Sequence, residues 1–259
     1  MKSITKWTIG GLASAALLSG GIIFSKYESI PEEKRTISFE NPQQTLDEAF
    51  RNCNPENISR IIYDPDFKDS DAYLRSSLSG RMSPSEIEIS IQNSRKLAEG
   101  HYMSVADVST KVGDGQKRQI FVRKELIGAP EVKSLADLEN AIYHEDVHAE
   151  EHRNGYDFGG RIVRGEELTR LCNTGEIRPE VIIGIGEIDA YASQIERAKK
   201  SQIKPSRTLM AGALTQLHRG YSILEKGLSN EKLTILERMY AERVIAKHKD
   251  TIETLKKHN

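Results

Sequence analysis

The sequence predicts an α+β fold, in which a mainly helical domain carries a small β-hairpin or sheet. Two observations support this class. Helical patterns with recognisable caps recur along most of the chain, and two short runs rich in β-branched and aromatic residues stand close together near its middle. The chain has 259 residues, which is enough to bury a sizeable core as one domain with additions or as two small domains.

The first 27 residues differ in composition from the rest of the chain. Lys2 and Lys6 precede an uncharged run from Thr8 to Phe24, and residues 28–41 then form a polar linker. This pattern is typical of a signal anchor, which is a single transmembrane helix, or of a signal peptide. We expect an uncleaved anchor, because the small residues "ASAA" lie inside the apolar run and not after it.

The two early lysines also predict an orientation. Since cytoplasmic flanks carry an excess of lysine and arginine, the residues after the anchor are expected on the non-cytoplasmic side of the membrane. Cleavage of the segment would instead give a secreted or periplasmic protein. Cys53 and Cys172 form a disulfide only in an exported domain, and two free buried thiols are an equal alternative.

Charge composition excludes one class of partner. The 37 lysine and arginine residues nearly balance the 38 aspartate and glutamate residues, and no long basic run is present. We therefore expect no nucleic-acid partner, because such proteins carry a basic patch or stripe.

The folded domain is expected over residues 42–259. A first helix starts with Asn41 as N-cap and Pro42 at its first position. Residues 63–82 are expected to form a loop with one helical turn at most. A second helix starts after Ser83, where Glu86 completes a capping box.

A β-hairpin is expected next. The runs "YMSVADVSTKV" (102–112) and "KRQIFVRKELI" (117–127) are joined by "GDGQ", which is a turn signal. A long helix then follows, with Ser134 as N-cap, Asp137 three residues later and Gly155 just past its end.

The C-terminal third is expected to be helical. After Pro179 a short apolar run, "VIIGIG", leads into a helical pattern that begins near Glu187. Residues 206–257 predict two long helices that part near 227–230. This pair is long enough to cover a neighbouring cleft, and we hypothesise a latency role for it.

The segment "AIYHEDVHAEEHRNG" (141–155) contains the candidate metal-binding and catalytic residues. His144 and His148 stand one helical turn apart, so their Cβ atoms are about 5–6 Å apart and both imidazoles can reach one ion. They lie at the edge of the apolar stripe, which is formed by Leu138, Ala141 and Ile142. The acidic residues of the opposite face are Glu139, Asp146 and Glu150. Glu145 cannot easily reach the same ion but can reach a water bound to it, which is the arrangement of the H-E-x-x-H motif.

This segment resembles the active-site helix of the zincin metallopeptidases, and the resemblance covers residues 104–195 at most. It implies a peptidase that acts on a protein or peptide substrate, with one catalytic Zn²⁺ held by His144, His148 and a third protein ligand. A water occupies the fourth position and Glu145 acts as general base. It also implies a sheet before the helix whose edge strand aligns the substrate, and the run 117–127 stands in that place.

The third ligand is not His152. It lies about 12 Å along the helix axis from His144, because each residue rises 1.5 Å. The metzincin branch of the family needs a glycine and a histidine where this chain has Glu151 and Asn154. The resemblance is therefore to the gluzincin branch, whose third ligand is a carboxylate from a later helix.

Two carboxylates compete for that place. Glu187 is preferred, because Ala190 one turn later completes an E-x-x-A pattern that lets two helices approach. Glu167 in "RGEELTRL" is the alternative, because it lies near the thermolysin-like spacing. Tyr191 stands where the family often has an aspartate, and Asp189 lies two residues after Glu187; both are candidates to hydrogen-bond a ligand or the transition state.

The residue that stabilises the oxyanion is not assigned, and the candidates are Tyr191, Tyr143 and His218. The functional alternative to a peptidase is a catalytically inactive zincin-like scaffold or a metal-binding, membrane-anchored adaptor. A degenerate peptidase has usually lost the catalytic glutamate, and this chain retains Glu145.

Overall fold

The structure is a computed structural model, and it describes residues 37, 40–80, 82–98, 103–105, 117–126, 129, 132–201, 204–230 and 232–256. The expected membrane segment, residues 1–27, and most of the linker, residues 28–41, lie outside this set. Among the described residues, no helix combines the length and the apolar character that a membrane span requires.

The architecture is mainly helical with small β-sheets, which is compatible with the expected α+β class. The helices are α1 (Pro42–Cys53), α2 (Lys68–Leu78), α3 (Pro84–Ala98), η2 (Lys124–Leu126), α4 (Leu135–Asn154), α5 (Gly165–Asn173), α6 (Pro179–Lys200), α7 (Arg207–Ser229), α8 (Ile235–Lys247) and α9 (Lys249–Lys256). The strands are β1 (Ile58–Tyr63), β2 (Met103–Val105), β3 (Arg118–Val122), β4 (Tyr156–Phe158) and β5 (Arg161–Val163).

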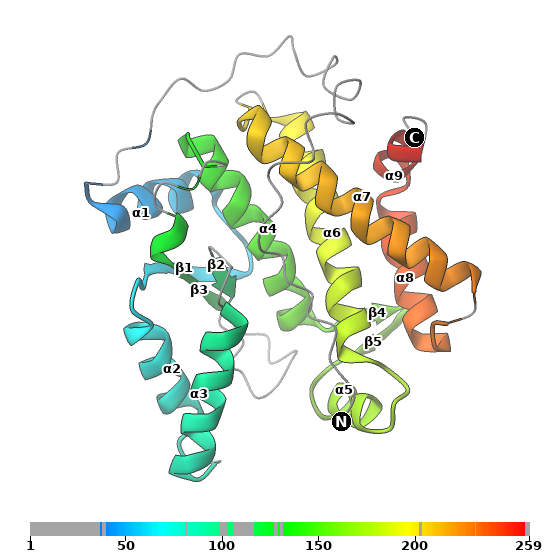
Figure 1. Cartoon of the computed structure of the whole chain (residues 1–259), viewed down its shortest axis with the longest axis horizontal. Coiled ribbons are helices and arrows are strands. Elements are labelled where there is room, and N and C mark those ends of the chain that lie inside the picture. The colour runs from blue at the N-terminus through cyan, green and yellow to red at the C-terminus, as the bar shows by residue number, and fades with distance from the viewer. Residues whose placement is uncertain are drawn as a thin grey trace.

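Helices α4 and α6 run through the middle of the molecule (Figure 1). Helix α1, the β1-β3-β2 sheet and the α2–α3 pair lie on the α4 side, whereas α7, α8 and α9 lie on the α6 side. One apolar cluster joins α1 and the sheet to α4, and another joins α6 to α7, α8 and α9. The contact between α4 and α6 therefore brings together two halves that each have their own core.

The sheet beside α4 contains the two strands expected to form a hairpin and one strand that was not expected. Residues 106–116, between the two expected strands, lie outside the described set. Strand β2 pairs antiparallel with β3, with Met103 opposite Val122 and Val105 opposite Ile120. Strand β1 pairs with β3 in parallel on the other side, so the order is β1-β3-β2. The expectation that the run 117–127 supplies an edge strand is wrong, because its strand, β3, is hydrogen-bonded on both sides.

The predicted helix caps are confirmed. The Asn41 side chain accepts a hydrogen bond from the Gln44 backbone, 3.3 Å away. Ser134 and Asp137 form the capping box at the start of α4. Gly155 ends α4 with φ +91°, and a Cβ there would lie 2.8 Å from the carbonyl oxygen of Val163. The ends of α4 are therefore defined by local chemistry that the sequence already contains.

Other boundaries differ from the expectation. Helix α2 occupies most of the segment expected to be a loop, and the predicted second C-terminal helix is divided at His248 into α8 and α9. Helix α6 begins at Pro179 and not near Glu187, with Ile182 and Ile185 buried in its first turns. A short apolar run does not distinguish a strand from a buried helix by periodicity, and here burial against neighbouring helices decides for the helix.

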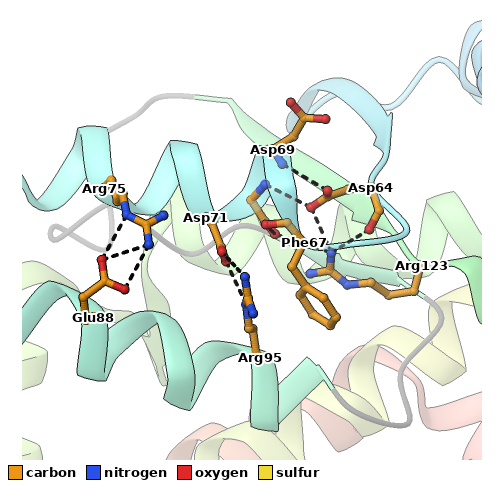
Figure 2. Close-up of polar contacts among 9 residues, drawn as sticks. Asp64, Phe67, Asp69, Asp71, Arg75, Glu88, Arg95 and Arg123 are labelled. Atoms are coloured by element: carbon orange, nitrogen blue, oxygen red, sulfur yellow. Dashed lines mark hydrogen bonds and ion pairs between the residues drawn. The ribbon is translucent and has the colours of Figure 1, made fainter.

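A buried ion pair joins the α2–α3 pair to the sheet (Figure 2). Asp64, just after β1, accepts hydrogen bonds from the backbone of Asp69 and Ser70 at 3.0 Å each, and lies 3.0 Å from Nη1 of Arg123. The Arg123 guanidinium lies 3.9 Å from the centroid of the Phe67 ring. Both charged side chains are almost fully buried, at 1% and 4% exposure. Asp64 therefore links the start of α2 to the residue that follows β3.

One residue of the polar face of α4, Asp146, is buried. Asp146 was expected on the face opposite the histidines, and its carboxylate accepts hydrogen bonds there from the backbone of Glu56 and Asn57, at 3.1 and 2.8 Å. The segment between α1 and β1 covers this side, so Asp146 is only 6% exposed. Helix α4 is thus held from two sides, which keeps its histidines in place.

Candidate metal centre

Two elements distant in sequence bring together three side chains that could hold a metal ion. Nε2 of His144 lies 3.5 Å from Oε2 of Glu187, and Nε2 of His148 lies 3.4 Å from Oε1 of the same carboxylate. One ligand atom from each residue lies within 4.8 Å of the others. In the part of the chain that the structure describes, no other group of His, Cys, Asp or Glu side chains meets this criterion.

The spacing fits a zinc ion. Zinc binds imidazole nitrogen and carboxylate oxygen at about 2.0–2.1 Å, so two ligand atoms of a tetrahedral site are roughly 3.3 Å apart. The nitrogen–oxygen distances of 3.4 and 3.5 Å are close to this value. Nε2 of His148 is buried and has no hydrogen-bond partner among the described residues. A set of two histidines and one glutamate is also a donor set of catalytic zinc sites, which leave a fourth position open.

The electrostatics of the cluster favour a cation. Burial by itself would raise the pKa of Glu187, but the adjacent imidazoles of His144 and His148 outweigh it and lower this pKa strongly. Burial would lower the pKa of His148, but Glu151 and Glu187 outweigh it and raise this pKa well above its usual value. The carboxylate is thus kept ionised and attracts positive charge, which a divalent ion supplies in place of protons.

Small residues let α6 approach α4 at the site. Gly186 immediately precedes Glu187, and a Cβ at this position would lie 2.9 Å from Oε2 of Glu151 on α4. Ala190, one turn after Glu187, is fully buried. These residues explain how a carboxylate on one helix reaches two imidazoles on another.

Tyr191 lies beside the converging group, and Glu145 is adjacent in sequence to His144 on α4. The Tyr191 ring lies 4.5 Å from the His144 ring, centroid to centroid. Burial, and then the charges of Glu187 and Glu145, raise the pKa of Tyr191 strongly, so the phenol keeps its proton.

Asp189, considered in the sequence as a group that hydrogen-bonds a ligand or the transition state, contacts residues outside the converging group. Its carboxylate lies 2.8 Å from Nζ of Lys247 and 2.8 Å from Nε2 of His248, and Ser193 donates to it at 3.2 Å. These contacts connect α6 to the C-terminal end of α8. Asp189 therefore helps to dock α8 and does not belong to the converging group.

The other candidates lie outside the converging group too. Glu167 on α5 forms an ion pair with Arg161, and its side chain is 41% exposed. His152 contributes a backbone carbonyl that accepts from Arg118 at 2.9 Å. The Tyr143 ring lies beneath the Arg197 guanidinium, 4.5 Å from ring centroid to Cζ.

The remaining oxyanion candidate is not in the group either. His218 lies on α7. Cys53 is buried on α1, Cys172 is partly buried on α5, and both are free thiols.

Two residues near the site were missed by sequence reasoning. Oε2 of Glu151 lies 3.9 Å from Nδ1 of His148. The Tyr240 hydroxyl, from α8, donates a hydrogen bond to Oε1 of Glu151. The sequence placed Glu151 on the correct helix but gave no sign of its contact with Tyr240, because that contact depends on how α8 docks.

No family model, no curated protein and no solved structure matches this chain. The function is therefore argued from the residues of the site and their geometry.

Proposed function

We propose that this protein is a zinc-dependent peptidase of the gluzincin type, in which His144, His148 and Glu187 hold one Zn²⁺ and Glu145 is the general base. The observation that supports the proposal is the convergence of the three ligands, with two nitrogen–oxygen distances of 3.4 and 3.5 Å. The histidine pair could arise on any helix with this spacing. A partly buried carboxylate from a second helix, facing the Nε2 atoms of both rings, is not a consequence of that spacing.

The histidines and the glutamate would contribute differently to binding the ion. His144 and His148 would donate the lone pairs of their Nε2 atoms, and Glu187 would neutralise one positive charge of the ion. A zinc ion bound there would lower the pKa of a coordinated water and polarise the scissile carbonyl. With three protein ligands, the fourth position of the ion would be left to that water. Structural zinc sites differ, because a fourth protein ligand closes them.

Glu145 would move the proton. It is adjacent in sequence to His144, and after burial and the charge of Glu187 its negative charge contributes to the raised pKa of Tyr191. In this role its carboxylate accepts a proton from the attacking water and delivers it to the leaving amine. Tyr191 retains its phenolic proton beside His144, so it is our candidate to hydrogen-bond the carbonyl oxygen as negative charge develops there.

The proposed substrate is a protein or peptide on the non-cytoplasmic side of a membrane. This location depends on the N-terminal segment, residues 1–27, acting as a single-pass anchor. Cleavage of that segment would make the same domain secreted or periplasmic.

The proposal is tested on the purified full chain and on Glu145→Gln. Zinc content is measured by elemental analysis, and cleavage is measured with a random peptide library. We expect one zinc ion per chain in both proteins and cleavage by the wild type alone.

Each other result has a defined meaning. Equal cleavage by both proteins would remove Glu145 as the base. Stoichiometric zinc without cleavage would support the inactive scaffold or adaptor. A wild type without zinc would refute the metal centre itself.

A further inference from the structure

We infer that Glu151, held by Tyr240 and seated against Gly186, is a positioning residue for the metal ligand His148. This inference rests on the proposed zinc centre and deepens it. It assigns a role to three residues that the H-E-x-x-H motif does not contain.

The first step is the contact between Glu151 and His148 on α4. Oε2 of Glu151 lies 3.9 Å from Nδ1 of His148, and the two side chains are 13% and 17% exposed. A negative charge at this distance on the Nδ1 side favours the tautomer that carries its proton on Nδ1. The lone pair then lies on Nε2, which faces Glu187 at 3.4 Å. Glu151 thus favours the tautomer that can bind a metal through Nε2.

The second step is the support that Tyr240 gives to Glu151. The Tyr240 hydroxyl donates to Oε1 of Glu151, while Oε2 is the oxygen that faces His148. The phenol keeps its proton, because burial and then the charge of Glu151 raise the pKa of Tyr240 well above its usual value. Its ring is fixed by Tyr156 and Phe158, whose centroids lie 5.7 and 5.6 Å away. Both oxygens of the carboxylate therefore have a defined neighbour.

The third step is the space that Gly186 leaves on α6. A Cβ at residue 186 would lie 2.9 Å from Oε2 of Glu151, which is closer than real Cβ contacts permit. The carboxylate therefore occupies the volume in which any other side chain would begin. Gly186 precedes the ligand Glu187, so the same turn of α6 supplies a ligand and makes room for the carboxylate that orients another.

The arrangement is asymmetric. Nδ1 of His144 is buried and has no hydrogen-bond partner among the described residues, and that ring lies against Tyr191 instead. The carboxylate therefore acts on His148 alone. Because Tyr240 lies on α8, the affinity for metal depends on the docking of this C-terminal helix. Helix α8 then completes the centre, in contrast to the covering role that we hypothesised from the sequence.

The test measures Zn²⁺ affinity of the full chain by competition with a chromophoric chelator. We expect Glu151→Gln and Gly186→Ala to weaken binding about 10- to 100-fold, the usual effect of losing a group that orients a metal-bound histidine. Tyr240→Phe keeps the ring contacts and should weaken binding roughly tenfold. The double variant Glu151→Gln/Tyr240→Phe should bind no more weakly than Glu151→Gln alone, because both changes act through one carboxylate.

The chain offers matched controls. Gly184 lies on the same helix, and a Cβ there would meet nothing within 4 Å, so Gly184→Ala should leave the affinity unchanged. Tyr221 on α7 donates to Glu225 at 3.2 Å, in a contact outside the metal-binding group, so Tyr221→Phe should also be without effect.

The visible spectrum of the Co²⁺-loaded protein separates positioning from general stability. We expect Glu151→Gln to alter this spectrum at saturating Co²⁺, with both controls unchanged. If the Glu151 variant does not fold, the pair Gly186→Ala and Gly184→Ala provides the same comparison.

Two results would refute the inference. A wild type that binds zinc, with unchanged affinity and Co²⁺ spectrum in the Glu151, Tyr240 and Gly186 variants, would overturn the role of Glu151 and leave the proposed peptidase standing. A wild type that binds no zinc would overturn both.

Discussion

Oε1 of Glu187 on α6 lies 3.4 Å from Nε2 of His148 on α4. This is close to the separation of two ligand atoms on one tetrahedral zinc ion, roughly 3.3 Å. The same carboxylate reaches His144 through its other oxygen at 3.5 Å. The relationship makes the third ligand of the proposed centre directly testable.

Glu187→Ala should reduce the zinc content to well below one ion per chain, because a three-ligand site loses its only carboxylate. Glu167→Ala is the matched control, since Glu167 is half exposed and paired with Arg161. Elemental analysis of both purified proteins decides whether Glu187 or Glu167 is the third ligand. Zinc loss in the Glu167 variant alone would transfer the ligand role to that residue.

Tyr191→Phe should lower kcat about 100-fold or more, with little change in zinc content, if the hydroxyl stabilises the oxyanion. The phenylalanine keeps the ring beside His144, which it contacts at 4.5 Å between centroids. Steady-state kinetics on a cleaved peptide provide the measurement, with Tyr221→Phe as the control. An unchanged kcat would return the oxyanion role to the other candidates.

Asp64→Ala should destabilise the fold by about 3–5 kcal/mol, because it leaves the buried Arg123 without its carboxylate partner. Glu88→Gln is the control, since the Arg75–Glu88 pair in Figure 2 is about half exposed and should contribute less than about 1 kcal/mol. The free energy of unfolding is measured by urea denaturation. Equal effects of the two substitutions would contradict this difference.

The contact between α6 and His248, which follows α8, should weaken as the pH rises. Nδ1 of His248 lies 2.9 Å from Glu196 and Nε2 lies 2.8 Å from Asp189. Burial would lower the pKa of His248, but these two carboxylates outweigh it and raise the pKa. A raised pKa stabilises the fold fully below the unfolded value of about 6.5, and this contribution is lost as the pH rises through the folded value.

We therefore expect the difference in unfolding free energy between the wild type and His248→Gln to be largest below about pH 6 and to shrink at higher pH. Urea denaturation of both proteins across this range is the measurement. A difference that grows with pH would contradict the imidazolium between two carboxylates.

A chain that ends at Ser201 should fail to fold. It loses α7, α8 and α9, whose buried apolar side chains include Leu217, Val244 and Leu255. Each such side chain contributes about 1.5–3 kcal/mol, and the whole fold is stable by only about 5–15 kcal/mol. Thermal unfolding followed by circular dichroism tests this, with a chain ending at Lys256 as control. A folded, more active product would instead support the latency role.

Local chemistry made much of the helical structure predictable. The caps at Asn41, Ser83 and Ser134 depend on residues three positions apart, so they could be recognised before the fold was known. Strand β1 and helix α2 were missed, because their stability comes from contacts with β3 and α3. The start of α6 was predicted too late, because its first turns are stabilised by the burial of Ile182 and Ile185 and not by a local signal.

The candidate site also has some features that the sequence predicts and others that it does not. The one-turn spacing of His144 and His148 follows from helix geometry, so the pair was predictable, as was the exclusion of His152 as a ligand by its distance along the axis. Glu187 could be chosen only by analogy with a family pattern. Glu151 was named only as a position that excluded the metzincin branch, and Tyr240 had no signal at all.

The sequence by itself determined the local features: the ends of α4, the shared face of its two histidines and the position of Glu145 beside them. These depend on backbone geometry within a few residues. Only the tertiary structure decided that Glu187 faces both imidazoles, that Asp189 bonds to α8 and that Tyr240 holds Glu151. Those contacts join residues on different helices, and the packing of α4, α6 and α8 into one core sets their distances.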